Sequence, residues 1–339
     1  MSIEKADTLE FQVEGYQDLE VSTQIIIKEA LERGHSVEVL DRANNFIRIK
    51  NDEKSELIQQ ATKTRLDSYM TYLVMENKVI TKLVLGEAGV RVPAGGHYES
   101  FEEASKSFDN FDGQDIVIKP VTTNFGIGVN LLSAPFSKAK FEATLKSAFE
   151  HDSSVIIESL VEGKEYRFLV IGGKVLAVCH RVPANVVGDG KHTLKELVEI
   201  KNQDPRRGKG HKKPLELIDT GEVETACLKD QGHDWSHVPE ESEQVFLRAN
   251  SNISTGGDSI DFTDKVNQAY FEIAEKAATA VGSEITGIDM MIKDPSEKPH
   301  FSNHAVIEAN FNPVLFIHQY PYQGENRDVG AAVLDLLGL

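Results

Sequence analysis

In residues 116–129 an apolar run ends in a lysine, and a glycine-containing loop follows it. Glycines let backbone N–H groups converge on an anion, and a lysine adds a positive charge. The stretch is not a P-loop, because it lacks GxxxxGK followed by Ser or Thr and its lysine precedes the glycines. It therefore indicates a phosphate-binding loop, with an ordinary hairpin turn as the alternative. The candidate ligands are Lys119, Thr122, Thr123, Gly126 and Gly128.

Lys82 is a second candidate for the same anion. It lies in the apolar segment 70–88, whose spacing predicts a helix that stops at Gly89 and leads toward Pro93. From that helix its ammonium group could reach a phosphate from the side opposite Lys119. The alternative is a solvated lysine on a helix surface.

Asp289, Glu308 and Asn310 offer oxygen ligands on strand-like sequence. Residues two apart point to the same face of a strand, so Glu308 and Asn310 are expected to lie side by side. Asp289 from a neighbouring strand would complete an all-oxygen set that suits Mg²⁺, which binds few carboxylates together with phosphates. The alternative is plain exposure at strand ends, which the apolar neighbours of all three residues disfavour.

Short apolar runs between glycine-containing turns must position these groups. These runs are predicted strands, and together with the predicted helices they indicate an α+β architecture. Ser22 is expected to cap a first helix that ends at Gly34, and the sequence between Asn202 and Glu243 is too rich in Pro and Gly for a long element. Strands are predicted at 36–40, 45–49, 115–119, 154–158, 165–171, 174–180, 287–292 and 305–310. Further helices are predicted at 141–149, 265–281 and 330–337.

The charge balance excludes some classes of partner. The chain has 36 Lys and Arg against 54 Asp and Glu, a formal net charge of −18. Binding to nucleic acid or to an anionic membrane relies on Lys and Arg, so neither partner is expected. Two cysteines, no signal-peptide pattern and no apolar run of about 18 residues predict a cytoplasmic protein.

Two local clusters could indicate an RNA-binding site or a metal site. The basic run 206–213 is broken by glycines and lacks interleaved aromatic residues, so it does not indicate RNA binding. His233 and His237 flank Trp235 with a spacing that resembles a metal-binding pair. No third ligand lies at a helpful spacing, so both histidines are expected to be surface residues.

The combination of two lysines, a glycine loop, Asp289 and Glu308-x-Asn310 resembles the ATP-grasp superfamily of carboxylate–amine ligases. Within it, four segments resemble the branch that holds cyanophycin synthetases and the C-terminal half of bifunctional glutamate–cysteine ligase/glutathione synthetase: 163–170, 181–190, 204–208 and 247–257. Residues 22–24 and 61–68 are most similar to the second of these families. The likeness extends from about residue 19 to the end.

The resemblance implies an ATP-grasp fold, in which two α+β subdomains hold ATP between them. A short N-terminal α/β segment would occupy residues 1–80 and the ATP-grasp domain residues 81–339. Within that domain, a lid subdomain would span about 115–180 and a catalytic subdomain about 181–339. The implied cofactors are ATP and Mg²⁺, with Mn²⁺ as a possible substitute.

The resemblance also implies roles for individual residues. Lys82 and Lys119 would contact the ATP phosphates, and the loop Thr122, Thr123, Gly126 and Gly128 would close over them. Glu158 with Leu160 would line the adenine site, and Glu165 would bind the ribose. Asp289, Glu308 and Asn310 would be the metal ligands. Apart from the resemblance, side-chain chemistry makes Arg248 the candidate for stabilising the oxyanion, because a planar guanidinium can hold a phosphoryl and a carboxyl oxygen. Lys119 and Arg181 are the further catalytic candidates, and ordinary salt bridges are the alternative for the arginines. The candidate substrate contacts are Arg167, Arg181, Asn185, Ser254, Thr255, Gly256 and Gly257.

The implied reaction is ATP-driven amide formation through an acyl phosphate, with glycine joined to γ-glutamylcysteine as the first expectation. The implied partners are small-molecule substrates, with a homodimer or association with a glutamate–cysteine ligase module as further possibilities. Two alternatives stay open. One is another amino-acid or dipeptide ligase of the cyanophycin-synthetase kind, and the other is a non-catalytic ATP-binding module.

Overall fold

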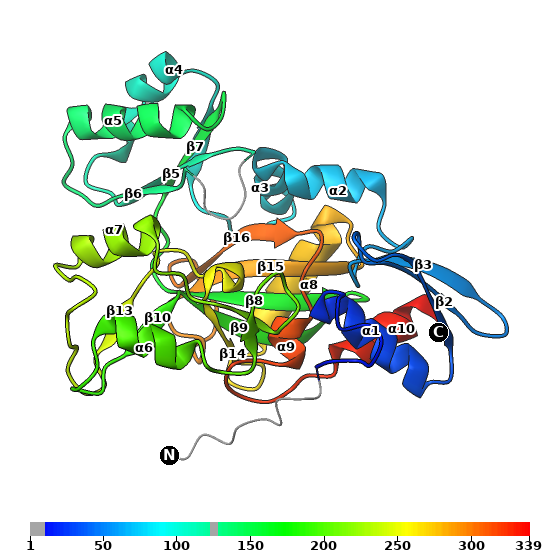
Figure 1. The fold of residues 1–339 in the computed structure, drawn as a ribbon. Coiled ribbons are helices and arrows are strands. Elements are labelled where there is room, and N and C mark those ends of the chain that lie inside the picture. The colour runs from blue at the N-terminus through cyan, green and yellow to red at the C-terminus, as the bar shows by residue number, and fades with distance from the viewer. Residues whose placement is uncertain (1–10, 123–127) are drawn as a thin grey trace.

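A five-stranded antiparallel sheet forms the centre of the computed structural model, which describes residues 11–122 and 128–339 (Figure 1). Its strands confirm the four predictions at 165–171, 174–180, 287–292 and 305–310 to within about two residues at each end. The antiparallel pairing throughout this sheet also agrees with the predicted α+β architecture. In spatial order the strands are β14 (Asp258–Asp261), β9 (Lys174–Val182), β8 (Lys164–Ile171), β15 (Ile285–Ile292) and β16 (His304–Asn310).

Helices cover both faces of this sheet, which is why its strands are apolar on both sides. Leu169 and Ile171 pack with α1 (Val21–Glu32), α9 (Phe316–Gln319) and α10 (Val329–Leu337). Phe168 and Val170, which alternate with them, pack on the other face. That face is covered by α8 (Ala269–Val281) together with α2 (Tyr69–Glu76) and α3 (Lys78–Glu87).

A smaller antiparallel sheet with its own core lies above the large one in Figure 1. Helices α4 and α5 and a 3₁₀ turn pack against it through a group of phenylalanines. In spatial order its strands are β4 (Gly95–Tyr98), β7 (Val155–Ser159), β5 (Ile116–Pro120) and β6 (Asn130–Leu132); α4 spans Phe101–Lys106, the 3₁₀ turn Phe108–Phe111 and α5 Lys138–Phe149.

The N-terminal segment folds as α1 followed by an antiparallel three-stranded sheet of β1 (Ser36–Asp41), β2 (Phe46–Lys50) and β3 (Ser55–Gln59). The prediction that Ser22 caps α1 is wrong. The helix begins at Val21, and the buried Ser22 hydroxyl instead accepts the N–H of Leu315 at 2.9 Å. This bond ties the start of the chain to its C-terminal part.

The single helix predicted over 70–88 is also wrong, because the chain breaks at Asn77. Asn77 has an extended backbone, and its side chain accepts the N–H groups of Val79 and Ile80, which makes it the N-cap of α3. The apolar periodicity continues across the break, so it conceals the cap. As a result Lys78 and Lys82 share one short helix, one turn apart.

The polar stretch between Asn202 and Glu243 contains short elements, as predicted, and the nine-residue helix α7 (Glu222–Asp230). Leu228 of this helix joins a separate small core. None of the helices in the described part of the chain combines the length and the apolar character needed to cross a bilayer. The other elements here are β10 (Asn185–Val187), α6 (Leu194–Lys201), β11 (Arg207–Gly208), β12 (Leu215–Glu216), β13 (Gln244–Phe246) and the 3₁₀ turn Ile253–Thr255.

We predict that α1 unfolds together with the large sheet, because both contribute to one core. Ile26 of α1 is fully buried, so Ile26→Ala should lower the free energy of unfolding by about 2–5 kcal/mol in a single transition. Ile200, which is 47% exposed on α6, provides the control: Ile200→Ala should cost less than about 1 kcal/mol. Denaturant unfolding followed by circular dichroism measures both. An early, separate transition in Ile26→Ala would contradict the shared core.

Candidate active site

A buried carboxylate between two guanidinium groups lies in the middle of the large sheet. Asp289 on β15 stands directly across from Arg167 on β8, which donates through Nε to Oδ1 and through Nη2 to Oδ2 at 2.6 Å. Arg181 on β9 donates through Nη2 to Oδ2 at 3.0 Å. Gly287 leaves room for this contact, since a Cβ there would lie 2.6 Å from Arg167 Cδ.

This cluster is close to electrically neutral. Burial alone raises the pKa of Asp289, but the two guanidinium groups outweigh burial and hold that pKa below its usual value. Arg181 also pairs with Glu165, whose other oxygen accepts the hydroxyl of Ser251. Two arginines thus balance two carboxylates, which is the condition under which buried charges are tolerated.

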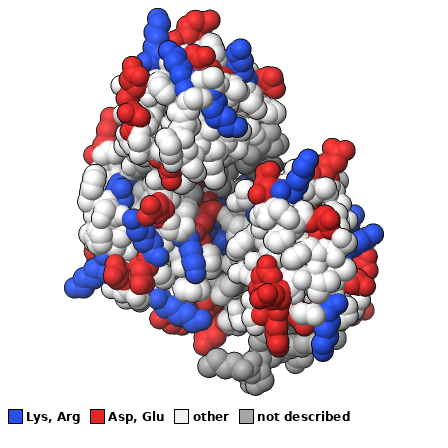
Figure 2. All heavy atoms as spheres, turned by 90° about the vertical axis from the view of Figure 1, so that its left-hand side faces the viewer, with Lys and Arg blue, Asp and Glu red and all other residues white. Residues whose placement is uncertain are grey.

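A cavity of about 480 Å³ opens over this cluster, and Figure 2 shows a hollow between the two parts of the molecule with charged side chains in and around it. Arg167 and Arg181 line the cavity. Arg181 Nε is buried and has no hydrogen-bond partner among the described residues, so it is a donor without an acceptor. The other charged lining residues are Glu20, Lys63, Glu76, Lys78, His211 and Glu308, and the apolar lining includes Tyr72, Met75, Phe311, Val314, Phe316 and Ile317.

Lys82 and Lys119 are brought together by the small sheet, as the sequence predicted. Lys82 Nζ on α3 and Lys119 Nζ on β5 each lie 2.5 Å from a different oxygen of Glu158 on β7. Burial raises the pKa of Glu158, but the two ammonium groups outweigh it and leave that pKa lowered. The Glu158 carboxylate therefore occupies the point where the two lysines converge. Its predicted role at an adenine site stays a prediction.

Lys78 is a cavity residue that sequence reasoning missed. It precedes Lys82 by one helical turn, so both project from the same face of α3. Its Nζ donates to the carbonyl of Val121 at 3.3 Å. Burial lowers its pKa, and the nearby Glu308 partly opposes that change. The four-residue spacing from Lys82 was a usable signal, because it places both lysines on the same face of a helix.

Two of the three predicted metal ligands line the cavity. Glu308 and Asn310 lie side by side on β16, and the Asn310 amide donates to Asp289 at 3.2 Å, which leaves its oxygen for a cation. This oxygen pair fits Mg²⁺ with phosphate and water as its remaining ligands. Asp289 comes from a neighbouring strand, as predicted, and pairs with Glu308 in register, but its oxygens face the two arginines. Its role as a metal ligand stays a prediction, and it would require one guanidinium group to move away from the Asp289 carboxylate.

The predicted nucleotide residues are only partly described. Thr122 donates its N–H and hydroxyl to Asp152 at 2.7 and 2.8 Å. Gly128 has a φ of 73°, and the Leu160 N–H donates to the carbonyl of Asp115 at 2.8 Å. Thr123 and Gly126 lie outside the described residues. Glu165 lies beside the arginine cluster described above, so its ribose role stays a prediction.

Arg248 lies away from the cavity lining given above. Its Nε donates at 2.5 Å to Glu224, a nearly inaccessible carboxylate on α7. This ion pair holds the guanidinium against a buried acid on α7. Its catalytic role therefore stays a prediction.

The remaining predicted substrate residues fall into two groups. Asn185 belongs to a second buried cluster, where it and Lys201 donate to Asp258 at 3.0 and 2.6 Å. Ser254 lines the cavity. Thr255 hydrogen-bonds within its own turn. Gly256, with a φ of 93°, lies close to Ile218, and Gly257, whose added Cβ would lie 2.7 Å from the Val182 carbonyl, lets that turn close against β9.

Comparisons with known proteins find several that this chain resembles. A family model described as an ATP-grasp-like domain matches residues 17–70. The glutathione biosynthesis bifunctional proteins of Clostridium perfringens and Listeria innocua are 51% and 47% identical over 97% and 99% of this chain. Those matches cover 42% and 43% of the relatives, so the chain spans less than half of their length.

A solved structure agrees with the sequence relatives. The crystal structure of a bifunctional glutathione synthetase from Pasteurella multocida matches with a TM-score of 0.76 and 39% identity. The match covers 97% of this chain and 45% of that one. The chain therefore has the ATP-grasp fold and is similar, over nearly all of its length, to one part of the bifunctional glutathione-biosynthesis proteins.

Proposed function

We propose that this chain is an ATP-dependent carboxylate–amine ligase that joins glycine to γ-glutamylcysteine, with ATP converted to ADP and phosphate. The observation that supports it most is the cavity with Arg167 and Arg181 in its wall, held by the buried Asp289. Guanidinium groups are the preferred partners of carboxylates, and both substrates carry carboxylates. The names of the relatives, which are longer proteins, support the choice of substrate.

The chemistry requires two steps. The substrate carboxylate oxygen attacks the γ-phosphorus of ATP, the bond to the β-phosphate oxygen breaks, and ADP leaves. The glycine amine then attacks the acyl phosphate, the C–O bond breaks, and phosphate leaves with the amine proton going to solvent or a base. Phosphoryl transfer of this kind depends on positioning and charge neutralisation more than on a protein nucleophile.

In the proposal, different charged side chains bind the ATP phosphates, the metal ion and the substrate carboxylate. Lys82 and Lys119 are the cations for the ATP phosphates, and phosphate oxygens would replace the Glu158 carboxylate between them. Mg²⁺, when bound near Glu308 and Asn310, would neutralise phosphate charge. Arg181, whose Nε lacks an acceptor, is the donor for a substrate carboxylate.

The cavity suits a dipeptide in size and in the signs of its charges. A volume of about 480 Å³ falls within the usual range for small-molecule sites. Glu20 and Glu76 in its wall can accept hydrogen bonds from an α-ammonium group while the arginines hold carboxylates. A substrate with charges of both signs at its ends would therefore be oriented in one direction.

The proposal extends to location and assembly. Both cysteines are free thiols, Cys179 buried and Cys227 partly buried, which suits a reducing cytoplasm. Homodimer formation and association with a glutamate–cysteine ligase module belong to the proposal as well. The limited share of the relatives' length that this chain covers is the reason to consider such a module.

Phosphate release from ATP and Mg²⁺ should depend on the correct pair of substrates. We expect release with γ-glutamylcysteine plus glycine, and little with either alone, because the amine is needed to discharge the acyl phosphate. A malachite-green assay over a panel of carboxylates and amines measures this. Release only with other pairs would refute the substrate assignment, and no release with any pair would favour a non-catalytic ATP-binding module.

Two variants link that release to the site. Glu308→Gln should lower the turnover number on the order of 100-fold with an unchanged circular dichroism spectrum, because it removes a charge expected to hold Mg²⁺. Glu325→Gln, at a carboxylate whose side chain is 77% exposed, is the matched control and should keep wild-type activity. Wild-type turnover in Glu308→Gln would show that this metal assignment is wrong.

Lys78 should make substrate binding sensitive to alkaline pH. Burial lowers its pKa, so its ammonium loses a proton at a lower pH than an exposed lysine does, and attraction for an anionic substrate weakens as pH rises. As pH rises through the alkaline range, the KM for γ-glutamylcysteine should rise more in wild type than in Lys78→Arg, which stays charged. The comparison at each pH cancels titration of the substrates. Parallel KM profiles would contradict the role.

A further inference from the structure

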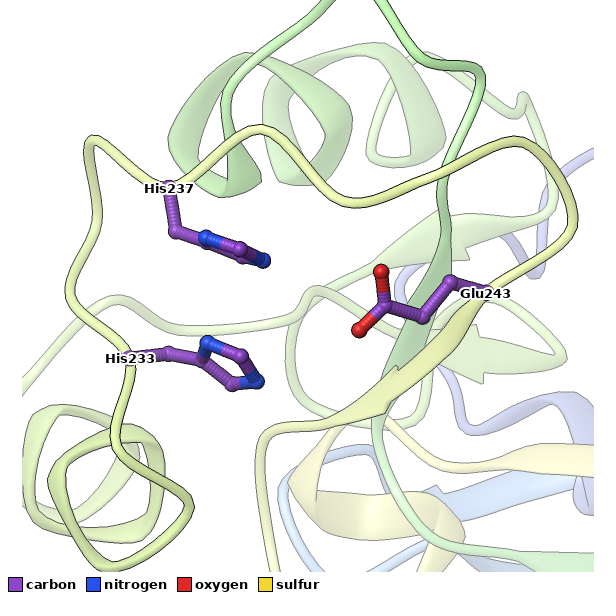
Figure 3. A group of neighbouring side chains, drawn as sticks. All are labelled: His233, His237 and Glu243. Carbon is purple, nitrogen blue, oxygen red and sulfur yellow. The ribbon is translucent and has the colours of Figure 1, made fainter.

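Two histidines and a glutamate converge in the loop that joins α7 to β13, away from the cavity. His233, His237 and Glu243 each place one ligand atom within 4.8 Å of the others, and Figure 3 shows the carboxylate directed toward the two rings. The sequence predicted surface histidines without a third ligand. The expectation that no third ligand is nearby is wrong, because the chain turns back after His237 and places Glu243 beside the two histidines.

We propose that these three side chains bind one divalent transition-metal ion, with Zn²⁺ as the probe. Imidazole nitrogen is a preferred ligand of zinc and its neighbours in the first transition row, whereas Mg²⁺ and Ca²⁺ take oxygen. Two histidines and one carboxylate form a known zinc set that leaves the fourth position to water. The site is therefore chemically distinct from the proposed Mg²⁺ position at Glu308 and Asn310.

The state of the ligands supports a bound cation. His237 Nε2 is buried and has no hydrogen-bond partner among the described residues, which is a costly state for an imidazole nitrogen. The rings of His233 and His237 are stacked, with centroids 4.1 Å apart and planes 25° apart. Glu243 Oε2 accepts the N–H of Glu240 at 2.7 Å, and the carboxylate has a second oxygen for a metal. A cation between these groups would satisfy the orphaned nitrogen.

The backbone around each ligand is anchored independently. The N–H of His233 donates to Leu228 at 2.9 Å, and the carbonyl of His237 accepts the N–H of Leu194 at 2.9 Å. The carbonyl of Glu243 accepts the N–H of Gly188 at 2.7 Å. Ligand atoms in tetrahedral zinc sites are about 3.4 Å apart, so side-chain rotation without backbone movement would close the present spacing.

A metal here would brace the segment that carries Arg248. His233 follows α7 by three residues, and Glu243 immediately precedes β13. Helix α7 supplies Glu224, the partner of Arg248, and Arg248 lies two residues beyond β13. One ion would therefore fix the helix and the strand relative to each other at the Arg248–Glu224 ion pair.

Zinc titration of the metal-free, untagged chain tests the proposal, in excess Mg²⁺ to occupy oxygen-only sites. We expect one equivalent of Zn²⁺ with a Kd below about 1 μM by competition with a chromophoric chelator, and a zinc-dependent rise in Tm. His237→Gln and Glu243→Gln should each weaken that equivalent at least about 10-fold. His192→Gln, at a histidine paired only with Asp189 on the surface, and Cys227→Ser should both retain it.

Two results would overturn the proposal. The first is the absence of any zinc equivalent that binds more tightly than about 100 μM, and the second is wild-type affinity in both site variants. If either variant unfolds, Co²⁺ binding to the wild-type chain tests the proposal instead. Visible d–d bands with the intensity of a low-coordinate nitrogen and oxygen site support the proposal, and the absence of these bands refutes it.

Discussion

The ion pair network around Asp289 is the constraint on which the rest of the site depends. A carboxylate with no solvent exposure cannot stay ionised alone, so Arg167 and Arg181 must lie against it. In return the carboxylate fixes both guanidinium groups in the wall of the cavity. Because its main members come from β8, β9 and β15, the network can form only when the central strands are in register, and Gly287 keeps the necessary space open.

The small sheet repeats the same physical solution with lysines in place of arginines. There, one buried carboxylate, Glu158, lies between Lys82 and Lys119. In the proposed reaction a phosphate would take the place of that carboxylate, so the lysines are held in position before ATP arrives. The chain as a whole is acidic, with a net charge of −18. In the proposed function, these clusters would offer positive charge to anionic substrates at two defined places.

The sequence was sufficient for the features that depend on local pattern. Alternating apolar residues predicted the central strands, and side-chain alternation correctly placed Glu308 beside Asn310 on one strand. Features that depend on pairing between distant segments were not accessible. The contact of Asp289 with both arginines requires knowledge of strand register, and the meeting of Glu243 with His233 and His237 requires the path of a loop. Asn77 was missed for a different reason, since the apolar pattern runs through the cap that divides α2 from α3.

The most direct test of the account is a crystal structure of the chain with Mg²⁺, a non-hydrolysable ATP analogue and γ-glutamylcysteine. The account predicts the dipeptide in the cavity, with a carboxylate oxygen within about 3.2 Å of a guanidinium nitrogen of Arg181 or Arg167. It also predicts that phosphate oxygens contact Lys82 and Lys119. A dipeptide bound elsewhere, or a nucleotide occupying the cavity beside the two arginines, would contradict it.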